Sequence, residues 1–254
     1  MAYCFGIYHW RRRLRSLLVA AGVSALALWI GMRGSTRESS RVVHACCLVA
    51  VVRSAVDAGR TVSGALSPPP WVVERYKYDA LAARLPLGRA DRVLDVGCGT
   101  GRSLVGLAPH LGGSTTLLGL DVFDDRVILG NGPALARRNA ALAGVEVTPL
   151  QGDAARPPVA TNTIDVVTAC RVLHDLPPPD ADRALGEFAR VCAPDGTVGV
   201  LELPLTPDEV DADPAAYWRE RTLAAGLEIE RLDRVDRCGA EGRYVVIVAT
   251  PVAE

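Results

Sequence analysis

Residues 93–101 read VLDVGCGTG, in which a short apolar stretch with one aspartate leads into three glycines spaced two residues apart. An apolar run of this length predicts a buried strand, and glycines directly behind it predict a tight turn. Gly97, Gly99 and Gly101 have no Cβ atom, so the backbone can turn sharply there and approach a ligand closely. A helix beginning near Arg102 would then point its free N–H groups at that ligand. The stretch therefore predicts a cofactor-binding loop between a strand and a helix.

The spacing of these glycines disfavours two phosphate-binding loops. A dinucleotide fingerprint requires G-x-G-x-x-G, but the residue three positions after Gly99 is Arg102. A P-loop requires a lysine followed by serine or threonine, and the only lysine of the chain is Lys77. A nicotinamide oxidoreductase is thus a disfavoured interpretation, and a nucleotide hydrolase is excluded.

From Trp71 onward, strand and helix patterns alternate along the chain. Strands separated by helices form βαβ units, which produce a mostly parallel sheet covered on both faces. The fold class that this order predicts is α/β. The expected strands are residues 92–97, 115–122, 145–150, 163–170, 197–203, 227–235 and 242–250, and the expected helices are residues 71–87, 101–111, 131–144, 179–194 and 213–226.

The glycine loop, with Asp95 in front of it, resembles motif I of the class I S-adenosylmethionine-dependent methyltransferases, E/D-x-G-x-G-x-G. Three further stretches follow in the family's order, and the resemblance covers about residues 71–251. It implies a doubly wound, mostly parallel, seven-stranded Rossmann-like sheet with an antiparallel last strand, and S-adenosyl-L-methionine as the cofactor. The group that it resembles most is the type 11-like methyltransferases of small molecules. The further stretches are LLGLDV, LQGDA and TIDVVTACRVLHDL, continued by VCAPDGTVGVLEL.

The same resemblance implies the cofactor-binding residues. Asp121 would accept both ribose hydroxyls, and Asp153 would accept the adenine amino group while the Ala154 N–H faces the ring. Asp95 would contact the methionine amino group indirectly. Each acid also has a purely structural alternative. Aspartate is common in turns, so Asp95 and Asp153 could each cap or form a turn. Asp121 could be a solvated acid at the end of its strand. The full expected set is Asp95, Gly97, Cys98, Gly99, Gly101, Asp121, Val122, Asp153, Ala154 and Cys170, the two cysteines being expected to pack there without reacting.

The acceptor side of the site is expected after the strand at 163–170. His174, with Asp175 beside it, is the candidate general base, because imidazole titrates near neutral pH. A histidine that merely caps the loop before three prolines is the alternative. Glu202 would also face the cleft, where it would either bind the acceptor or merely terminate its strand. Three other roles are hypotheses for four residues. Arg171 could hold an acidic substrate, and Asn131 could be the N-cap of a helix. Tyr76 and Tyr78 could close the pocket, with core packing as the alternative.

The N-terminal part differs from the rest in charge and hydropathy. Residues 1–60 contain nine arginines against Glu38 and Asp57, whereas residues 61–254 contain 19 basic and 27 acidic residues. An acidic globular part disfavours a nucleic-acid substrate. Seven cysteines without a CxxC pair or a Cys/His metal spacing predict free thiols in a reducing compartment and no metal site.

Residues 16–32 are uncharged and follow a cluster of arginines. Seventeen helical residues span roughly 26 Å, the short end of a bilayer crossing. A signal peptide would share the charged start, but no signal-peptidase cleavage site follows, so we interpret this stretch as a membrane anchor. The alternative is a start of translation at Met32. The apolar run 42–52 is too short to cross alone and predicts an interfacial or packed helix. Arginines flank the first stretch on both sides, so the positive-inside rule does not fix its orientation.

These patterns predict three parts: a basic, hydrophobic segment 1–60, a proline-rich linker 61–70, and a methyltransferase domain 71–254 on the cytoplasmic face of a membrane. The expected function is methyl transfer to a small or lipid-like acceptor. The alternative is a non-catalytic sensor or scaffold that binds S-adenosylmethionine at the membrane.

Overall fold

The computed structural model describes residues 2–33, 39–66, 69, 71–207 and 210–252. It divides into two compact units. The sheet unit consists of residues 1–5, 73–123 and 131–254, and the hairpin unit of residues 6–72 and 124–130. The two units are described separately below.

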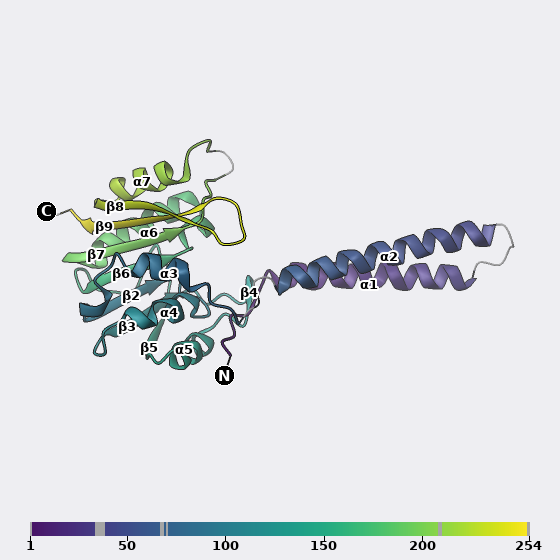
Figure 1. The fold of residues 1–254 in the computed structure, drawn as a ribbon, viewed down its shortest axis with the longest axis horizontal. Helices are drawn as coiled ribbons and strands as arrows, with labels where there is room; N and C mark the ends of the chain where they lie inside the picture. Colours follow the sequence, from purple (N-terminus) through teal and green to yellow (C-terminus); the bar gives the residue numbers. More distant parts are fainter. Residues whose placement is uncertain (1, 34–38, 67–68, 70, 208–209, 253–254) are drawn as a thin grey trace. The chain divides into compact units, whose positions relative to one another are not determined.

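The sheet unit is built on seven strands (Figure 1). Strand β2 pairs in parallel with β3 and β6, and β9 is antiparallel to both of its neighbours, β7 and β8. The expected Rossmann-like sheet with an antiparallel last strand is thereby confirmed. In sheet order the strands are β5 (Val147–Gln151), β3 (Thr116–Asp121), β2 (Arg92–Val96), β6 (Ile164–Cys170), β7 (Cys192–Glu202), β9 (Arg243–Pro251) and β8 (Leu227–Asp236).

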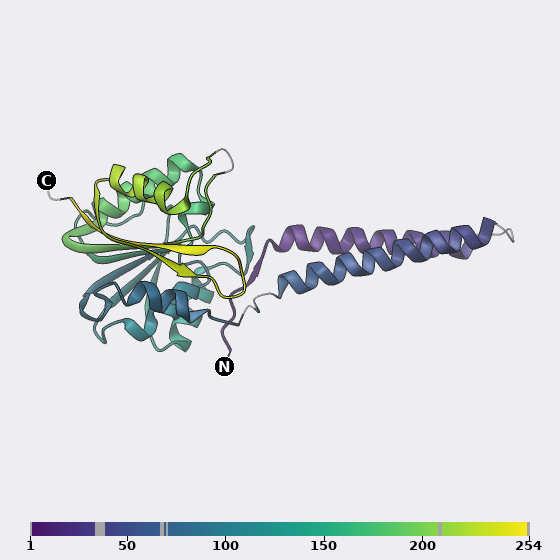
Figure 2. The same ribbon diagram turned by 45° about the horizontal axis from the view of Figure 1, so that its top comes forward.

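Helices cover both faces of this sheet, as the alternating pattern predicts (Figures 1 and 2). One hydrophobic core includes Phe188 and Trp218 from the helices of one face, and the other includes Tyr78 and Leu104 from the opposite face. The first face carries α6 (Pro178–Val191) and α7 (Pro214–Ala224), and the second carries α3 (Arg75–Ala82), α4 (Arg102–Leu107) and α5 (Pro133–Leu142).

Helix α3 is shorter than the helix expected over 71–87, and its tyrosines do not act alike. Tyr78 is buried in the core, where a Cβ atom on Gly106 would lie 2.3 Å from its ring. It therefore fills the α3–α4 interface, and the hypothesis that it closes a pocket is wrong. The Tyr76 hydroxyl accepts a hydrogen bond of 3.1 Å from the backbone N–H of Cys238.

Residues 2–5 fold onto the sheet unit rather than with the hydrophobic segment that follows them. Phe5 is fully buried, with the guanidinium of Arg102 stacked 4.4 Å from its ring centroid. The Thr100 hydroxyl donates to the Phe5 carbonyl over 3.3 Å, and the Asn139 amide donates to the Cys4 carbonyl over 2.7 Å. No local sequence pattern marks this contact, because it joins residues about 100 positions apart.

The hairpin unit contains two long helices that lie side by side and antiparallel, α1 (Trp10–Arg33) and α2 (Ser39–Ala65) (Figures 1 and 2). The Arg13 guanidinium donates to the Thr61 carbonyl over 3.3 Å, so the start of α1 lies beside the end of α2. The short strands β1 (Ile7–Tyr8) and β4 (Ile128–Leu129) pair antiparallel within the same unit.

Helix α2 corrects the expectation of a short helix over 42–52. The charged residues Arg53, Asp57 and Arg60 end the apolar run but do not interrupt the helix, because all three are compatible with helical backbone. The helix also includes residues 61–65, which the sequence reading assigned to the linker. Linker residues 67, 68 and 70 lie outside the described part of the chain.

The two long helices contact each other mainly through small side chains and expose most of their large apolar ones. Ala27 and Ser54 are buried in the seam, whereas Leu18 and Val49 are 63% and 66% exposed. This distribution is the reverse of that in a water-soluble helix pair, which buries its large apolar side chains. The buried or half-buried seam positions include Leu17, Ala20, Ser24 and Ala27 of α1 and Cys47, Ala50, Ser54 and Ala58 of α2.

Candidate functional site

The glycine loop joins β2 to α4 and turns over the end of β3. The backbone N–H groups of Gly97 and Cys98 both donate to the Leu120 carbonyl, over 2.7 and 3.0 Å. Gly97, Gly99 and Gly101 have positive φ angles of 69°, 52° and 85°, a region that other residues rarely adopt. All three glycines are therefore required by the course of the backbone.

The surroundings of the glycines differ. A Cβ atom on Gly97 would lie 2.2 Å from Val172, and one on Gly101 would lie 3.1 Å from the Ala136 carbonyl oxygen. These two glycines allow neighbouring elements to pack closely. On Gly99, by contrast, the nearest atom would be Oδ2 of Asp121 at 3.8 Å. The loop thus leaves room at its central glycine, next to the acid at the end of β3.

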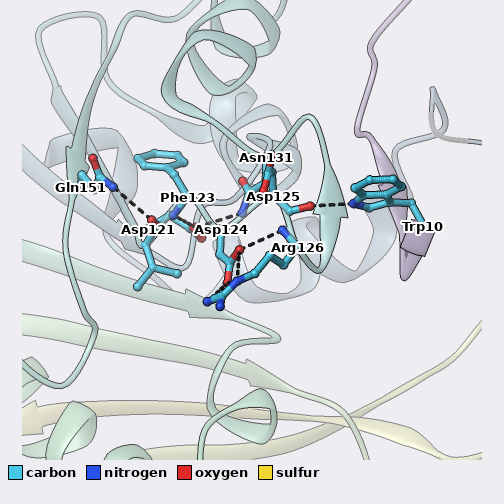
Figure 3. Close-up of polar contacts among 9 residues, drawn as sticks. Trp10, Asp121, Phe123, Asp124, Asp125, Arg126, Asn131 and Gln151 are labelled. Atoms are coloured by element: carbon cyan, nitrogen blue, oxygen red, sulfur yellow. Dashed lines mark hydrogen bonds and ion pairs between the residues drawn. The ribbon is translucent and has the colours of Figure 1, made fainter. Parts of the chain in front are cut away.

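Asp121 is held in place through both of its carboxylate oxygens, and Figure 3 shows its contacts with Phe123 and Asn131. Oδ2 accepts a hydrogen bond of 2.9 Å from the Gly99 N–H, and Oδ1 accepts from the Phe123 N–H over 2.7 Å and from the Asn131 amide over 3.2 Å. Oδ2 keeps one lone pair for a further bond, whereas Oδ1 accepts from a ligand only where the ligand replaces one of its two present donors. The expected N-cap role of Asn131 is wrong: Gly132 is the N-cap of α5, and the Asn131 amide donates to a carboxylate instead.

The loop after Asp121 continues into the hairpin unit. Val122 is exposed, and its carbonyl accepts from the Gln151 amide over 3.4 Å (Figure 3). Within the hairpin unit the Asp125 carbonyl accepts a 2.7 Å hydrogen bond from the Trp10 indole, and Asp124 pairs with Arg126. Residues 124–130 therefore belong to the hairpin unit and are hydrogen-bonded to the first residue of α1. The sequence did not indicate this contact.

Asp95 lies beneath the loop and is fully buried. Its carboxylate accepts hydrogen bonds from the hydroxyls of Ser103 and Thr168, the latter over 2.8 Å. Burial raises the pKa of Asp95 to about 7, although the two hydroxyl bonds act in the opposite direction. The side chain thus joins β2 to α4 and β6 instead of capping the turn.

We expect Asp95→Asn to flatten the pH dependence of stability. Because the folded pKa exceeds the unfolded value of 3.8, stability is greatest below pH 4 and is lost as the pH rises through about 7. The loss between pH 5 and pH 8 is on the order of 3 kcal/mol, or roughly 8 °C in Tm. Thermal unfolding of the full chain in mild detergent at pH 5 and pH 8 measures it, with Asp153→Asn as the exposed control. Equal pH slopes in wild type and Asp95→Asn would contradict the shift.

The candidate adenine-binding residues follow β5. Asp153 is exposed, and its Oδ1 accepts a 2.9 Å hydrogen bond from the Ala155 N–H, while Ala154 is buried. This Asx-type turn is what the structural alternative predicted for Asp153. Cys98 is buried, and burial raises the pKa of both Cys98 and Cys170 well above the ordinary value. The two thiols therefore remain protonated, in agreement with a packing role.

His174, which is half-buried, pairs with the buried Glu202 rather than with its neighbour in sequence. It lies in the short 3₁₀ helix η3 (Leu173–Asp175), and its Nδ1–H donates to Oε2 of Glu202 over 2.6 Å. Glu202 is fully buried and also accepts from the N–H groups of Val172 and Leu173, over 2.9 and 2.7 Å. Asp175 is largely exposed and lies 3.5 Å from Nε2 of His174.

This pairing determines the pKa and the tautomer of the His174 imidazole. Burial lowers the pKa of His174, but the hydrogen bond and charge of Glu202 outweigh it, so the pKa is raised above its ordinary value. With Nδ1–H bound to a carboxylate, neutral His174 presents the lone pair of Nε2. Sequence reasoning named both residues but missed their contact, because 28 positions separate them.

Sequence comparisons match part of this chain to known methyltransferases. Residues 93–196 match the family model of the methyltransferase domain. The demethylmenaquinone methyltransferases of Lactobacillus johnsonii and Thermus thermophilus are each 35% identical, over 47% and 50% of this chain and 46% and 54% of theirs. The 27-O-demethylrifamycin SV methyltransferase of Amycolatopsis mediterranei is 30% identical over 59% of this chain and 52% of its own. The chain thus spans about half the length of these curated relatives.

Solved structures share the fold at lower identity. A SAM-dependent methyltransferase from Aquifex aeolicus has a TM-score of 0.55 and 20% identity, covering 71% of this chain and 92% of its own. The [4+2]-cyclase SpnF has a TM-score of 0.56 and 24% identity, covering 70% of this chain and 82% of its own. A fold of this kind therefore accompanies more than one named activity. Residues 93–196 thus match a methyltransferase domain in sequence, and the sheet unit shares its fold with a SAM-dependent methyltransferase.

Proposed function

We propose that the protein transfers a methyl group from S-adenosylmethionine to a small or lipid-like acceptor. The observation that carries this proposal is the Asp121 carboxylate, held 2.9 Å from the Gly99 N–H at the one glycine of the loop that leaves room beside it. A carboxylate at the end of the second strand suits the two ribose hydroxyls of an adenosyl group. The two demethylmenaquinone methyltransferases support a lipid-like acceptor.

The residues present fit this cofactor. Asp121 would hold the ribose, the backbone of the glycine loop would lie against the methionine part, and Ala154 would lie against the adenine, with Val122 and Asp153 at its edge. When bound, S-adenosylmethionine supplies a methyl group on a positively charged sulfur, which needs no protein nucleophile. The chain itself contributes positioning and the exclusion of water.

The proposed base is His174. Its Nε2 accepts the proton of an acceptor hydroxyl: the O–H bond breaks, an N–H bond forms, and the electron pair stays on the acceptor oxygen. Glu202 is a positioning residue, because it holds Nδ1–H and stabilises the imidazolium that results. Asp175, which the sequence paired with His174, is proposed only as a weak electrostatic partner, since its side chain is largely exposed.

The hairpin supports membrane attachment of the enzyme. Residues 10–30 and 41–65 are the two segments of the described chain that are long and apolar enough to cross a membrane. At 1.5 Å per residue they measure about 31 and about 37 Å, against about 30 Å for the hydrocarbon core. Small side chains in the seam and large apolar ones outside suit helices packed in lipid. We propose that both helices, not the first alone, anchor the protein, with the sheet unit on the cytoplasmic side, where the cofactor is available.

We expect removal of the hairpin to release the protein from membranes. Because Arg13 contacts Thr61, residues 14–60 can be excised and replaced by a short Gly/Ser linker without moving the flanking chain. The full chain should stay in the membrane pellet after high-salt and alkaline carbonate washes, and the excised variant should be in the supernatant. Recovery of the full chain in the carbonate supernatant would contradict an anchor that spans the bilayer.

The proposed function itself is tested on the full chain in lipid nanodiscs. The measurement is formation of S-adenosylhomocysteine from S-adenosylmethionine, with and without a quinone-containing lipid extract as the acceptor. Acceptor-dependent formation would support the enzyme. Saturable binding of S-adenosylmethionine without turnover on any acceptor fraction would support the non-catalytic sensor instead, and binding of NAD alone would contradict both.

A further inference from the structure

The base of the helical hairpin, where α1 begins and α2 ends, is rich in arginine. Arg11, Arg12 and Arg15 lie in the first two turns of α1 and are exposed. Arg13 is half-buried and donates to the Thr61 carbonyl of α2. Because this contact places the first turns of α1 beside the last turns of α2, the charged residues in the second half of α2 lie at the same end of the hairpin.

Helix α2 brings Arg53 and Arg60 to this end, and both side chains are exposed. Arg53 is eight residues from Thr61, so it lies about 12 Å along the helix from the contact with Arg13. The base thus carries six arginines, whereas the sequence between the two apolar stretches, residues 33–41, carries three. The length of α2 therefore makes the hairpin asymmetric in charge, which the sequence alone did not indicate.

This positive charge is offset only in part. The hairpin unit contains ten arginines and no lysine against four acids, whereas the sheet unit contains 18 basic and 25 acidic residues. Arg60 lies 3.8 Å from Asp57. Arg12, Arg15 and Arg53 have no ion-pair partner among the residues that the structure describes. These three guanidinium groups are therefore available to an anion outside the chain.

Two tryptophans of α1 mark the levels at which lipid headgroups would meet the hairpin. Trp10 and Trp29 are 19 residues apart, or about 29 Å along the helix, against about 30 Å for the hydrocarbon core. Tryptophan is enriched at both membrane–water interfaces. The Arg11 guanidinium lies 5.3 Å from the centroid of the Trp10 ring, so the arginines at the start of α1 lie at or just inside the headgroup level of the base.

The position of Arg53 indicates the kind of anion. It lies within residues 41–65, a segment long and apolar enough to cross a membrane. A charged side chain inside such a segment is costly unless it reaches the polar headgroups or a buried partner. Arg53 is exposed, and Arg60 lies on the same face of α2 two turns nearer the base. The long Arg53 side chain can therefore extend toward the base, where it meets lipid phosphates.

We propose that Arg12, Arg15 and Arg53 form a basic collar around the base of the hairpin, and that this collar binds the headgroup phosphates of anionic lipids. Guanidinium groups stay charged and donate two parallel hydrogen bonds to phosphate oxygens. Basic residues next to a membrane-spanning helix attract anionic lipids in the same way. The inference rests on the proposed membrane attachment, and it adds the class of lipid that surrounds the anchor. The six arginines at the base also favour the cytoplasmic side for that end, by the positive-inside rule.

Spin-labelled lipids test the basic collar. The full chain is reconstituted in phosphatidylcholine vesicles that contain a trace of phosphatidylglycerol or phosphatidylcholine, spin-labelled at the end of one acyl chain. The electron paramagnetic resonance spectrum separates lipids that contact the protein from lipids of the bulk bilayer. We expect phosphatidylglycerol to be enriched about five-fold over phosphatidylcholine in the contacting fraction. The variant Arg12→Gln/Arg15→Gln/Arg53→Gln should lower this preference to less than about two-fold, with the number of contacting lipids per protein unchanged.

A matched control removes three charges from the sheet unit. The variant Arg89→Gln/Arg92→Gln/Arg219→Gln changes exposed arginines and should keep the wild-type preference. Raising the ionic strength from about 0.1 M to about 1 M shortens the screening length from about 10 Å to about 3 Å, so the wild-type preference should fall.

The outcomes separate this inference from the proposed function. Equal association of the two lipids with the wild type, or an unchanged preference in the collar variant, would overturn the inference and leave the anchor in place. A spectrum without any contacting lipid would overturn the anchor and the basic collar together. A protein that prefers phosphatidylglycerol but forms no S-adenosylhomocysteine on any acceptor fraction would keep the basic collar and contradict the proposed enzyme.

Discussion

Asp121→Ala is expected to weaken S-adenosylmethionine binding by at least about 100-fold. The alanine removes the acceptor proposed for two ribose hydroxyls, and hydrogen bonds to a charged group contribute about 1.5–3 kcal/mol each. It also releases the Gly99 N–H, which the carboxylate holds at 2.9 Å, so the loop loses part of its fixed shape. Calorimetric titration of the full chain with S-adenosylmethionine and S-adenosylhomocysteine measures the effect.

Two further variants separate the ligand contact from the shape of the loop. Asn131→Ala removes a neutral donor to Oδ1 but keeps the carboxylate, so its expected effect is a few-fold at most. Glu228→Ala, on an exposed position of β8, is the control for a lost surface charge and should bind normally. Affinity within three-fold of wild type in a folded Asp121→Ala protein would contradict the ribose assignment.

Glu202→Gln is expected to reduce kcat by about 10²–10⁴-fold, as in other enzymes in which the carboxylate that orients a histidine is replaced by an amide. The glutamine carbonyl can still accept from the N–H groups of Val172 and Leu173, which preserves η3. Its amide N–H₂ would instead donate to Nδ1 of His174. The proton of the neutral ring then moves to Nε2, and the lone pair needed to accept the acceptor proton is lost.

The pH profile distinguishes this positioning role from a structural one. Glu202 raises the pKa of His174, and a base must be neutral, so wild-type kcat/KM should rise with pH through a pKa above 6.5. Without the Glu202 charge the remaining activity should rise at a lower pH. Asp175→Asn is the matched control: its carboxylate is largely exposed, so kcat should change little. An unshifted profile in Glu202→Gln, or equal losses in both variants, would argue against the His174–Glu202 pair.

The parts of this structure that the sequence predicted are those set by short-range patterns. The glycines at 97, 99 and 101 predict a turn, because glycine is the residue that adopts positive φ angles without steric cost, as it does at all three positions. Strand and helix periods in the sheet unit were read correctly for the same reason, as each element carries its own apolar pattern. The resemblance to a family then supplied the antiparallel last strand of a mostly parallel sheet, which no local pattern contains.

The parts that were missed depend on contacts between distant residues. The His174–Glu202 pair and the burial of Phe5 join segments that only the folded sheet brings together. Asn131 was assigned by its position before a helix, but a nearby carboxylate competes successfully for its amide. The length of α2 was underestimated because the apolar run ends at Arg53, whereas helical backbone continues through the charged residues.

Lys77 gives the sheet unit a built-in chemical reporter. It is the only lysine of the chain, and its side chain is fully buried, paired with Glu74 and 5.4 and 5.5 Å from the rings of Tyr78 and Tyr244. Amine-directed acylating reagents therefore reach this ammonium group only when the core around α3 opens. The rate at which Lys77 is acylated in the native protein would measure that opening without any engineered label.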